Sequence, residues 1–218
     1  AQNAEQMRRE FSANVSHELK TPLQGIIGSA ELLESGMVKP EDTPRFVGHI
    51  RKEASRLVNL IEDIIRLSQL DEGVELPTEA VDMLAMAEDV KEILAPSAVE
   101  KHVKIDVTGN GFMINGVRRM LQEIIYNLCD NAVKYNVPGG SVAIHVENNR
   151  LVVRDTGIGI PAEHKDRIFE RFYRVDKSHS KASGGTGLGL SIVKHAAAYH
   201  NAKISLDSAP GKGTTITI

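Results

Sequence analysis

The chain has 218 residues, with 26 basic and 29 acidic side chains and a formal net charge of −3. A balance this close to neutral gives no basic field, so composition argues against a nucleic-acid partner. The single cysteine, Cys129, excludes a framework of internal disulfides and indicates a reducing compartment. No apolar run approaches the roughly 20 residues needed to cross a bilayer, and no signal peptide is recognisable.

The first predicted element is a long amphipathic helix. Its apolar residues recur at steps of three and four, which is the spacing of one helical face. These residues are Phe11, Val15, Leu19, Leu23, Ile26, Ala30 and Leu33. Glycine and proline in the segment 34–40 end this helix, and Thr43 and Pro44 suit the start of a second one.

The second helix carries a similar stripe, made of Val47, Ile50, Ala54, Leu57, Ile61 and Ile64. Two long helices joined by a short loop predict an antiparallel hairpin, and a lone hairpin cannot bury stripes this wide. We therefore expect two copies of the chain to dimerise into a four-helix bundle. A bundle that only holds two subunits together is the plainer alternative.

His17 lies off the apolar stripe of the first helix, within the stretch Ser16–Pro22. A free imidazole has a pKa of about 6.5, so at neutral pH most such rings offer a lone pair without a strong base. Thr21 is the i+4 neighbour of His17, whereas Glu18 lies about 100° around the helix and does not automatically touch the ring. The stretch indicates a candidate phosphoryl acceptor, with an isolated surface histidine as the ordinary alternative.

From about residue 72 the chain predicts a mixed α/β domain, because glycine and β-branched residues become frequent. Short strands are expected at Val103–Val107, Ser141–Val146, Arg150–Arg154, Lys203–Leu206 and Thr214–Ile218.

Three helices are expected in this domain. One begins after Asp82, one after Asn115, and one runs from about Gly187 to His200 and ends at Asn201, a residue that tolerates the left-handed conformation. The first should face inward with Ala87, Val90, Ile93 and Leu94, and the second with Met120, Leu121, Ile124, Ile125 and Leu128.

Two polar clusters in this domain indicate a ligand site. Asn127 and Asn131 are four residues apart on one helix, so both side chains point the same way, with Lys134 and Tyr135 a turn further on. The segment Asp155–Ile160 follows a strand and places a carboxylate at a glycine turn, where a ligand can approach the backbone.

Two further segments complete the pattern. Phe169–Arg174 is aromatic and basic, and Gly184–Leu190 is a glycine-rich turn that runs into a helix, where backbone amides can face phosphate oxygens. Each segment alone has an ordinary explanation as surface polarity, a common turn or a hydrophobic plug. A dinucleotide fingerprint with Asp207 as its acidic residue is disfavoured, because the preceding segment 175–181 is polar and not strand-like.

Five segments resemble, in family order, the sequence boxes of bacterial two-component sensor histidine kinases. Phe11–Pro22 resembles the H box, Asn127–Tyr135 the N box, Asp155–Gly159 the first glycine box, Phe169–Arg174 the F box and Gly185–Leu190 the second glycine box. Together they span essentially the whole chain, and the combination is highly specific.

The resemblance implies an α+β architecture in two domains. Residues 1–71 would form the dimerisation and histidine-phosphotransfer hairpin, as half of a dimeric four-helix bundle. Residues 72–218 would form an α/β-sandwich ATP-binding domain of the gyrase, heat-shock chaperone, histidine kinase and mismatch-repair type. The implied activity is that of a protein-histidine kinase, which phosphorylates His17 from Mg²⁺-bound ATP and passes the phosphoryl group to an aspartate on a response regulator.

The resemblance also implies roles in nucleotide binding. Asp155 would accept a hydrogen bond from the adenine amino group, and Gly157 and Gly159 would let the base approach. Asn131 would hold Mg²⁺ through its amide oxygen, with Asn127 beside it.

Phosphate and sugar contacts are implied for the remaining boxes. Lys134 and Tyr135 would contact phosphate and the sugar or base, and Arg174 could reach the γ-phosphate. The hinge and phosphate cradle of a lid, spanning roughly residues 160–185, would be formed by Gly185, Gly187, Leu188 and Gly189.

On the first helix, Glu18 would hydrogen-bond the Nδ1–H group of His17, and Thr21 could orient a water that removes phosphate from the regulator. An ATPase of the same fold and a non-catalytic dimeric signalling scaffold remain alternatives. The polar stretch 1–10 looks cut from a longer helix. We therefore expect the chain to be the cytoplasmic portion of a cell-membrane sensor whose anchor lies in other segments, or else of a natively soluble protein.

Overall fold

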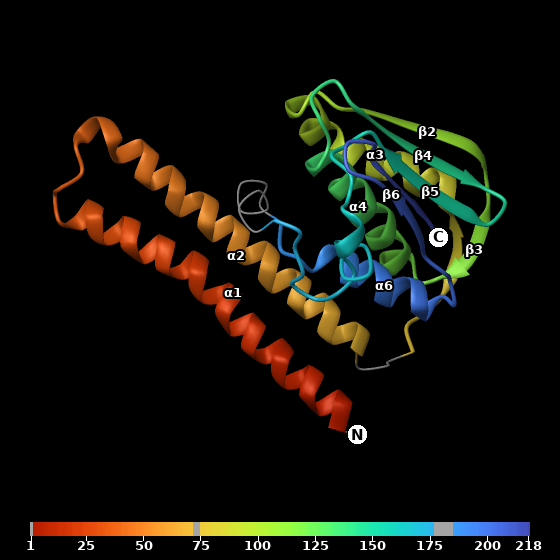
Figure 1. Ribbon diagram of the computed structural model, residues 1–218, viewed down its shortest axis with the longest axis horizontal. Helices are drawn as coiled ribbons and strands as arrows, with labels where there is room; N and C mark the ends of the chain where they lie inside the picture. Colours follow the sequence, from red (N-terminus) through yellow and green to blue (C-terminus); the bar gives the residue numbers. More distant parts are fainter. Residues whose placement is uncertain (1, 72–74, 177–184) are drawn as a thin grey trace.

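Two long helices form an antiparallel hairpin in the computed structural model, which describes residues 2–71, 75–176 and 185–218. Helix α1 (Gln2–Glu34) and helix α2 (Thr43–Asp71) are joined by a loop with one 3₁₀ turn, η1 (Pro40–Asp42). Figure 1 shows them side by side at the edge of the molecule. The predicted hairpin is thus confirmed.

Both helices leave large apolar side chains exposed in the single chain. Those on α1 and α2 are Leu23, Ile27, Leu32, Val47, Val58, Ile61 and Ile65. Apolar side chains gathered along a helix face favour burial against another surface. Leu23, Val47 and Ile61 belong to the predicted stripes, so one hairpin leaves part of each stripe uncovered.

The second domain is an α/β sandwich. A mixed five-stranded sheet has the order β2 (Lys104–Gly111), β4 (Ser141–Glu147), β5 (Arg150–Asp155), β7 (Thr214–Thr217) and β6 (Ser205–Ser208). Only β2 and β4 run parallel; the other neighbours are antiparallel. Helices α3 (Met83–Glu100), α4 (Arg118–Lys134) and α6 (Gly189–Tyr199) lie together beside the sheet (Figure 1).

The expected strands and helices are present, and α3 begins where the Asp82 carboxylate caps the amides of Leu84 and Ala85 at 3.0 and 3.1 Å. The expected inward face of α3 is wrong at Ile93, which is 52% exposed, whereas Val90 and Leu94 are buried. Residue 93 lies about 100° around the helix from residue 94, which moves it off the buried face.

Several boundaries differ from the sequence expectation for physical reasons. Helix α4 begins at Arg118 and not directly after Asn115, because β3 (Met113–Gly116) pairs with β1 (Glu79–Asp82) in a small second sheet that the sequence analysis missed. Helix α6 begins at Gly189, since Gly187 has a φ of +76°, which is not helical. Asn201 does adopt the left-handed conformation, with a φ of 54°.

The core of the α/β domain lies between the sheet and its helices, and a second, smaller cluster joins the two domains. Leu60 and Leu67 of α2 pack with Leu188 and Ile192 at the start of α6, and all four are buried. Phe11 of α1 and Phe172 border this cluster and stack at 5.7 Å between ring centroids. The hairpin is therefore docked beside the loops that precede α6 (Figure 1).

Candidate active site

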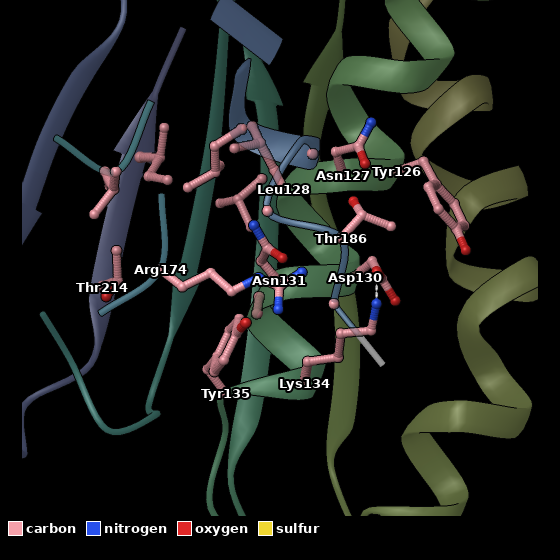
Figure 2. A pocket seen from close by; sticks show the side chains of 18 of the residues that line it. Tyr126, Asn127, Leu128, Asp130, Asn131, Lys134, Tyr135, Arg174, Thr186 and Thr214 are labelled. Carbon is pink, nitrogen blue, oxygen red and sulfur yellow. Dashed lines mark ion pairs between the residues drawn. The ribbon is translucent and has the colours of Figure 1, made fainter. Parts of the chain in front are cut away.

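A cavity of about 890 Å³ opens between α4, the sheet, the glycine-rich turn before α6 and the side of α2. Its lining includes most of the predicted binding residues: Asn127, Asn131, Lys134, Tyr135, Asp155, Gly159, Arg174, Gly185, Gly187 and Gly189. Figure 2 shows the α4 side chains, Arg174 and Thr186 around this space. Gly157 and Leu188 are buried behind the lining and shape it through the backbone.

Asp155 stands at the end of β5 and is held by the backbone around it. Its Oδ1 atom accepts hydrogen bonds from the amides of Gly157 at 2.8 Å and Thr214 at 3.2 Å. Burial raises the pKa of the Asp155 carboxyl, and these two hydrogen bonds act in the opposite direction. Among the described residues Oδ2 has no hydrogen-bond donor, so it can accept one from a ligand in the cavity.

The turn after Asp155 is packed so closely that it requires glycine. Gly159 has a φ of +71°, and a Cβ atom there would lie 1.9 Å from the carbonyl oxygen of Ala209. A Cβ atom on Gly157 would lie 2.4 Å from the carbonyl oxygen of Tyr135. The cavity wall beside this turn is apolar, with Val153, Ile158, Ile160 and Ile216 in the lining. A flat ring with an exocyclic amine suits this wall and the free Asp155 oxygen.

The two α4 asparagines lie one turn apart and face the cavity (Figure 2). Asn127 donates through Nδ2 to the Glu123 carbonyl at 2.8 Å, which leaves its Oδ1 atom facing Gly189. Beside Asn131, the Lys134 ammonium pairs with Asp130 at 2.6 Å. The helix thus presents amide oxygens and a cation to the same space.

The oxygen atoms around Asn131 suit a metal ion that also binds a ligand phosphate, and not a metal ion held by protein side chains alone. Within residues 2–71, 75–176 and 185–218, no three His, Cys, Asp or Glu side chains group closely enough to hold an ion. Mg²⁺ commonly takes one or two protein oxygens and completes its shell with substrate phosphates and water. The Asn131 amide oxygen fits that pattern when a nucleotide phosphate is its neighbour.

The glycine-rich turn brings backbone amides to the cavity. Gly185 and Gly187 line it, and the Thr186 hydroxyl accepts a hydrogen bond from the Leu188 amide at 3.2 Å. Helix α6 then starts at Gly189, where the first amides have no partner within the helix. Such a terminus favours an anionic ligand. Of the expected lid, residues 177–184 lie outside the described residues.

The histidine helix meets this cavity through Glu18. His17 is exposed on α1, and the Thr21 hydroxyl donates to the His17 carbonyl at 3.3 Å. The Oε2 atom of Glu18 lies 3.5 Å from the Arg174 guanidinium and 4.0 Å from that of Arg56. Among the described residues, neither Glu18 nor Thr21 bonds the His17 ring. Arg174 instead links the cavity to the residue next to His17.

Helix α2 also lines the cavity, a contribution that the sequence did not predict. Asp63 accepts a hydrogen bond from the Thr186 hydroxyl at 2.7 Å, and Arg66 pairs with both Asp63 and Glu123 at 3.4 Å. Burial raises the pKa of the Asp63 and Glu123 carboxyls. Asp63 and Arg66 lie three residues apart and off the apolar stripe of α2. Ordinary solvated residues have the same spacing, so the sequence gives only a weak signal for a role in the cavity.

Two family models match the chain, one in each domain. Residues 7–73 match the His Kinase A (phospho-acceptor) domain, and residues 116–218 match the histidine kinase-, DNA gyrase B- and HSP90-like ATPase. In the part of the chain that the structure describes, no helix is long and apolar enough to span a membrane.

Curated and solved proteins extend the comparison. The chain is 40% identical over 220 residues to the sensor-like histidine kinase SenX3 of Mycolicibacterium smegmatis, with 98% of this chain and 57% of that protein covered. It therefore spans just over half the length of that relative. Full-length ShkA in complex with AMPPNP is 28% identical, with a TM-score of 0.69 and coverage of 98% of this chain and 44% of that one.

A third comparison supports the two-domain architecture. Histidine kinase ThkA, solved in complex with the response regulator protein TrrA, has a TM-score of 0.76 over 99% of this chain and 62% of that one. Its identity is 20%, so it bears on the fold alone. The α+β fold predicted from the sequence, a helical hairpin followed by an α/β ATPase domain, is confirmed.

Proposed function

The chain belongs to the sensor histidine kinase family, and on that basis we propose that it phosphorylates itself on His17 from ATP and transfers the phosphoryl group to an aspartate of a response regulator. One observation carries the proposal. Arg174 lines the cavity and pairs at 3.5 Å with Glu18, the residue next to His17. The Arg174–Glu18 ion pair therefore connects the nucleotide cavity with the helix segment that carries the phosphoryl acceptor, His17.

In this proposal the cavity holds ATP with its base against Asp155. Oδ2 of Asp155 accepts from the adenine amino group, and Gly157 and Gly159 keep the turn free of side chains. Tyr135 and Lys134 border the sugar and phosphates. The Gly185–Gly189 turn and the first amides of α6 cradle the phosphates, with buried Leu188 anchoring the turn on α2.

Magnesium would be held by Asn131, whose amide oxygen faces the cavity, with Asn127 beside it. When bound, the ion neutralises phosphate charge. Arg174 and Lys134 add positive charge on the same side of the site. Asn127 carries an amide and not a carboxylate, so it cannot act as the base that would activate water. This residue favours transfer to a side chain over hydrolysis.

The chemical step is an in-line attack by the Nε2 atom of His17 on the γ-phosphorus. The N–P bond forms as the bond to the β,γ-bridging oxygen breaks, and ADP leaves with that electron pair. The Nδ1–H proton of the resulting cation passes to the Glu18 carboxylate and then to water. Rate acceleration comes mainly from positioning and charge neutralisation, as in other phosphoryl transfers.

Transfer to a response regulator follows on the exposed hairpin. Membership of the sensor histidine kinase family supports this partner class. The exposed apolar faces of α1 and α2 support a homodimer through a four-helix bundle. Thr21, one turn from His17, would orient a water that hydrolyses the phosphorylated regulator, so the protein would be both kinase and phosphatase.

We assign residues 1–71 to the phosphotransfer domain and 72–218 to the catalytic domain. We also assign the chain to the cytoplasmic portion of a longer membrane sensor, as the length of SenX3 suggests.

Three assays on one preparation test this function against its alternatives. Wild type and His17→Gln are incubated with radiolabelled ATP and Mg²⁺, while protein-bound label, free phosphate and nucleotide binding are measured. We expect label that is acid-labile and base-stable in the wild type only, with nucleotide binding equal in both. Free phosphate without label would indicate an ATPase, and absence of nucleotide binding would indicate a scaffold. A Thr21→Ala protein that still dephosphorylates the regulator at the normal rate would remove the phosphatase step.

A further inference from the structure

Four charged side chains form a row that crosses from α2 to the cavity. Arg56 of α2 lies with Nη1 3.9 Å from Glu53 and with Nη2 4.0 Å from Oε2 of Glu18. The same Oε2 atom lies 3.5 Å from Arg174. Two carboxylates and two guanidiniums therefore alternate, and their formal charges cancel.

Arg56 is the most deeply placed polar group of the hairpin part of this row, with 9% of its surface exposed. A guanidinium withdrawn from water is costly unless it is paired. The five donors of arginine can bind two carboxylates at once, which lysine cannot do with the same geometry. The site of Arg56 thus fits a residue that must hold Glu18 and Glu53 together.

The two arginines that share Glu18 differ in what else they can bind. Arg174 belongs to the ATPase domain and lines the nucleotide cavity, whereas Arg56 is fixed within the hairpin and is absent from the lining. When Arg174 turns toward a nucleotide phosphate, Glu18 keeps Arg56 as its cationic partner. On α1 itself, the side chains one turn from Glu18 are uncharged: Asn14, Val15, Thr21 and Pro22. His17 is the adjacent titratable group.

We infer that Arg56 is a positioning residue for the phosphorylation of His17: it holds the Glu18 carboxylate in place beside α1 once Arg174 has moved to the nucleotide. The inference rests on the proposed function. Arg56 touches neither nucleotide nor the reacting nitrogen, and acts only through Glu18. Without Arg56, the Glu18 carboxylate would have no cationic side chain to fix its position once Arg174 binds the nucleotide.

A purely structural brace between α1 and α2 makes different predictions, so the readouts are chosen to separate the two roles. Arg56→Gln, the conservative Arg56→Lys and the exposed control Arg51→Gln are each made with Glu18 and with Glu18→Gln. The initial rate of His17 labelling at saturating ATP is measured against pH, together with nucleotide affinity and the melting temperature.

We expect Arg56→Gln to lower the labelling rate by about 10- to 100-fold, which is less than the roughly 10²- to 10⁴-fold of a full proton-transfer contribution because Glu18 itself is retained. The acid limb of its pH profile should move to higher pH, while nucleotide affinity changes by less than about twofold. Arg56→Lys keeps the charge but not the geometry that binds two carboxylates, so it should lose less of the rate than Arg56→Gln, and Arg51→Gln should lose none. With Glu18→Gln in place, Arg56→Gln should lower the rate by less than about twofold further.

Equal rate losses with and without Glu18, or an unchanged rate and pH profile, would overturn the inference. If Arg56→Gln does not fold, the smaller effect of Arg56→Lys must likewise disappear in the Glu18→Gln protein. An unlabelled wild type would contradict the proposed function itself, whereas a labelled wild type with an Arg56 effect independent of Glu18 contradicts only the role of Arg56.

Discussion

Replacing Gly159 by alanine tests whether the turn after Asp155 is shaped by close packing against the segment before β7. A Cβ atom at 159 would lie 1.9 Å from the Ala209 carbonyl oxygen and 2.6 Å from its carbon. Real Cβ contacts are essentially never below 3.0 Å, so the two segments must separate by about 1 Å. Overpacking of this kind costs about 1–3 kcal/mol, and a left-handed alanine costs about 1–2 kcal/mol more.

Gly139 supplies the matched control, because its φ is +81° and no atom lies within 4 Å of its Cβ position. Gly139→Ala therefore loses stability only through backbone strain. Restricting the unfolded chain offsets roughly 0.4–1 kcal/mol of that loss in the free energy of unfolding. For a domain of this size, about 2–4 °C is lost per kcal/mol. Gly159→Ala should lower the melting temperature by about 5–15 °C and weaken nucleotide binding, whereas Gly139→Ala should lower the melting temperature by less than about 6 °C. Equal melting temperatures for the two variants, measured by calorimetry, would refute the packing argument.

Four other predictions follow from the site and the core. Asp155→Asn keeps an acceptor for the backbone but turns a donor toward the base, so nucleotide affinity measured by calorimetric titration should fall by roughly 30- to 150-fold, with little change in stability. Burial raises the pKa of Asp63 in the folded protein, so protonation of this carboxyl favours the folded state. This stabilisation is complete below the unfolded pKa of about 3.9 and is lost as the pH rises through the folded pKa. Asp63→Asn, which keeps an acceptor for Thr186, should therefore gain in melting temperature over wild type as pH rises from about 4 to 8. Ile125→Ala should cost about 2–5 kcal/mol in denaturant unfolding and Ile93→Ala under about 1 kcal/mol. Ile61→Glu should shift the proposed dimer toward monomer in light scattering.

Each of these four predictions would be contradicted by a specific result. Unchanged nucleotide affinity in Asp155→Asn would remove the carboxylate from the base contact. A constant difference in melting temperature between Asp63→Asn and wild type at every pH would show that the carboxyl does not titrate as described. Similar losses for the two isoleucines would contradict the burial of Ile125 on α4 and the exposure of Ile93 on α3. An undiminished dimer in Ile61→Glu would place the interface elsewhere.

The elements that could be predicted from the sequence are those whose signal is local. The stripes of α1 and α2 repeat over many turns, and β4 and β5 alternate β-branched residues, so periodicity alone locates them. Asn127 and Asn131 share a face by helical geometry, and a strand followed by glycines locates Asp155. These local rules place most of the predicted binding residues in the cavity lining.

What the sequence could not predict depends on contacts between distant segments. Strand β1 is four residues long and forms only against β3, so neither has a pattern of its own. Asp63 looks like an ordinary solvated position until Thr186, in the turn before α6, lies beside α2. Arg56 looks the same until Glu18 of α1 lies beside it. The partner of Glu18 was likewise out of reach, because Arg174 lies more than 150 residues away in the chain and in the other domain.

The central claim is that a ring nitrogen of His17 receives the γ-phosphoryl group of a nucleotide bound in the α4 cavity. The most direct measurement incubates the protein in parallel with ATP labelled on the γ- or the α-phosphate and maps the label by mass spectrometry under basic conditions. The account predicts label from the γ-phosphate only, on the peptide that contains His17, and none in Asn131→Ala. Label on another residue, or a bound nucleotide with His17 unmodified in every condition, would contradict it.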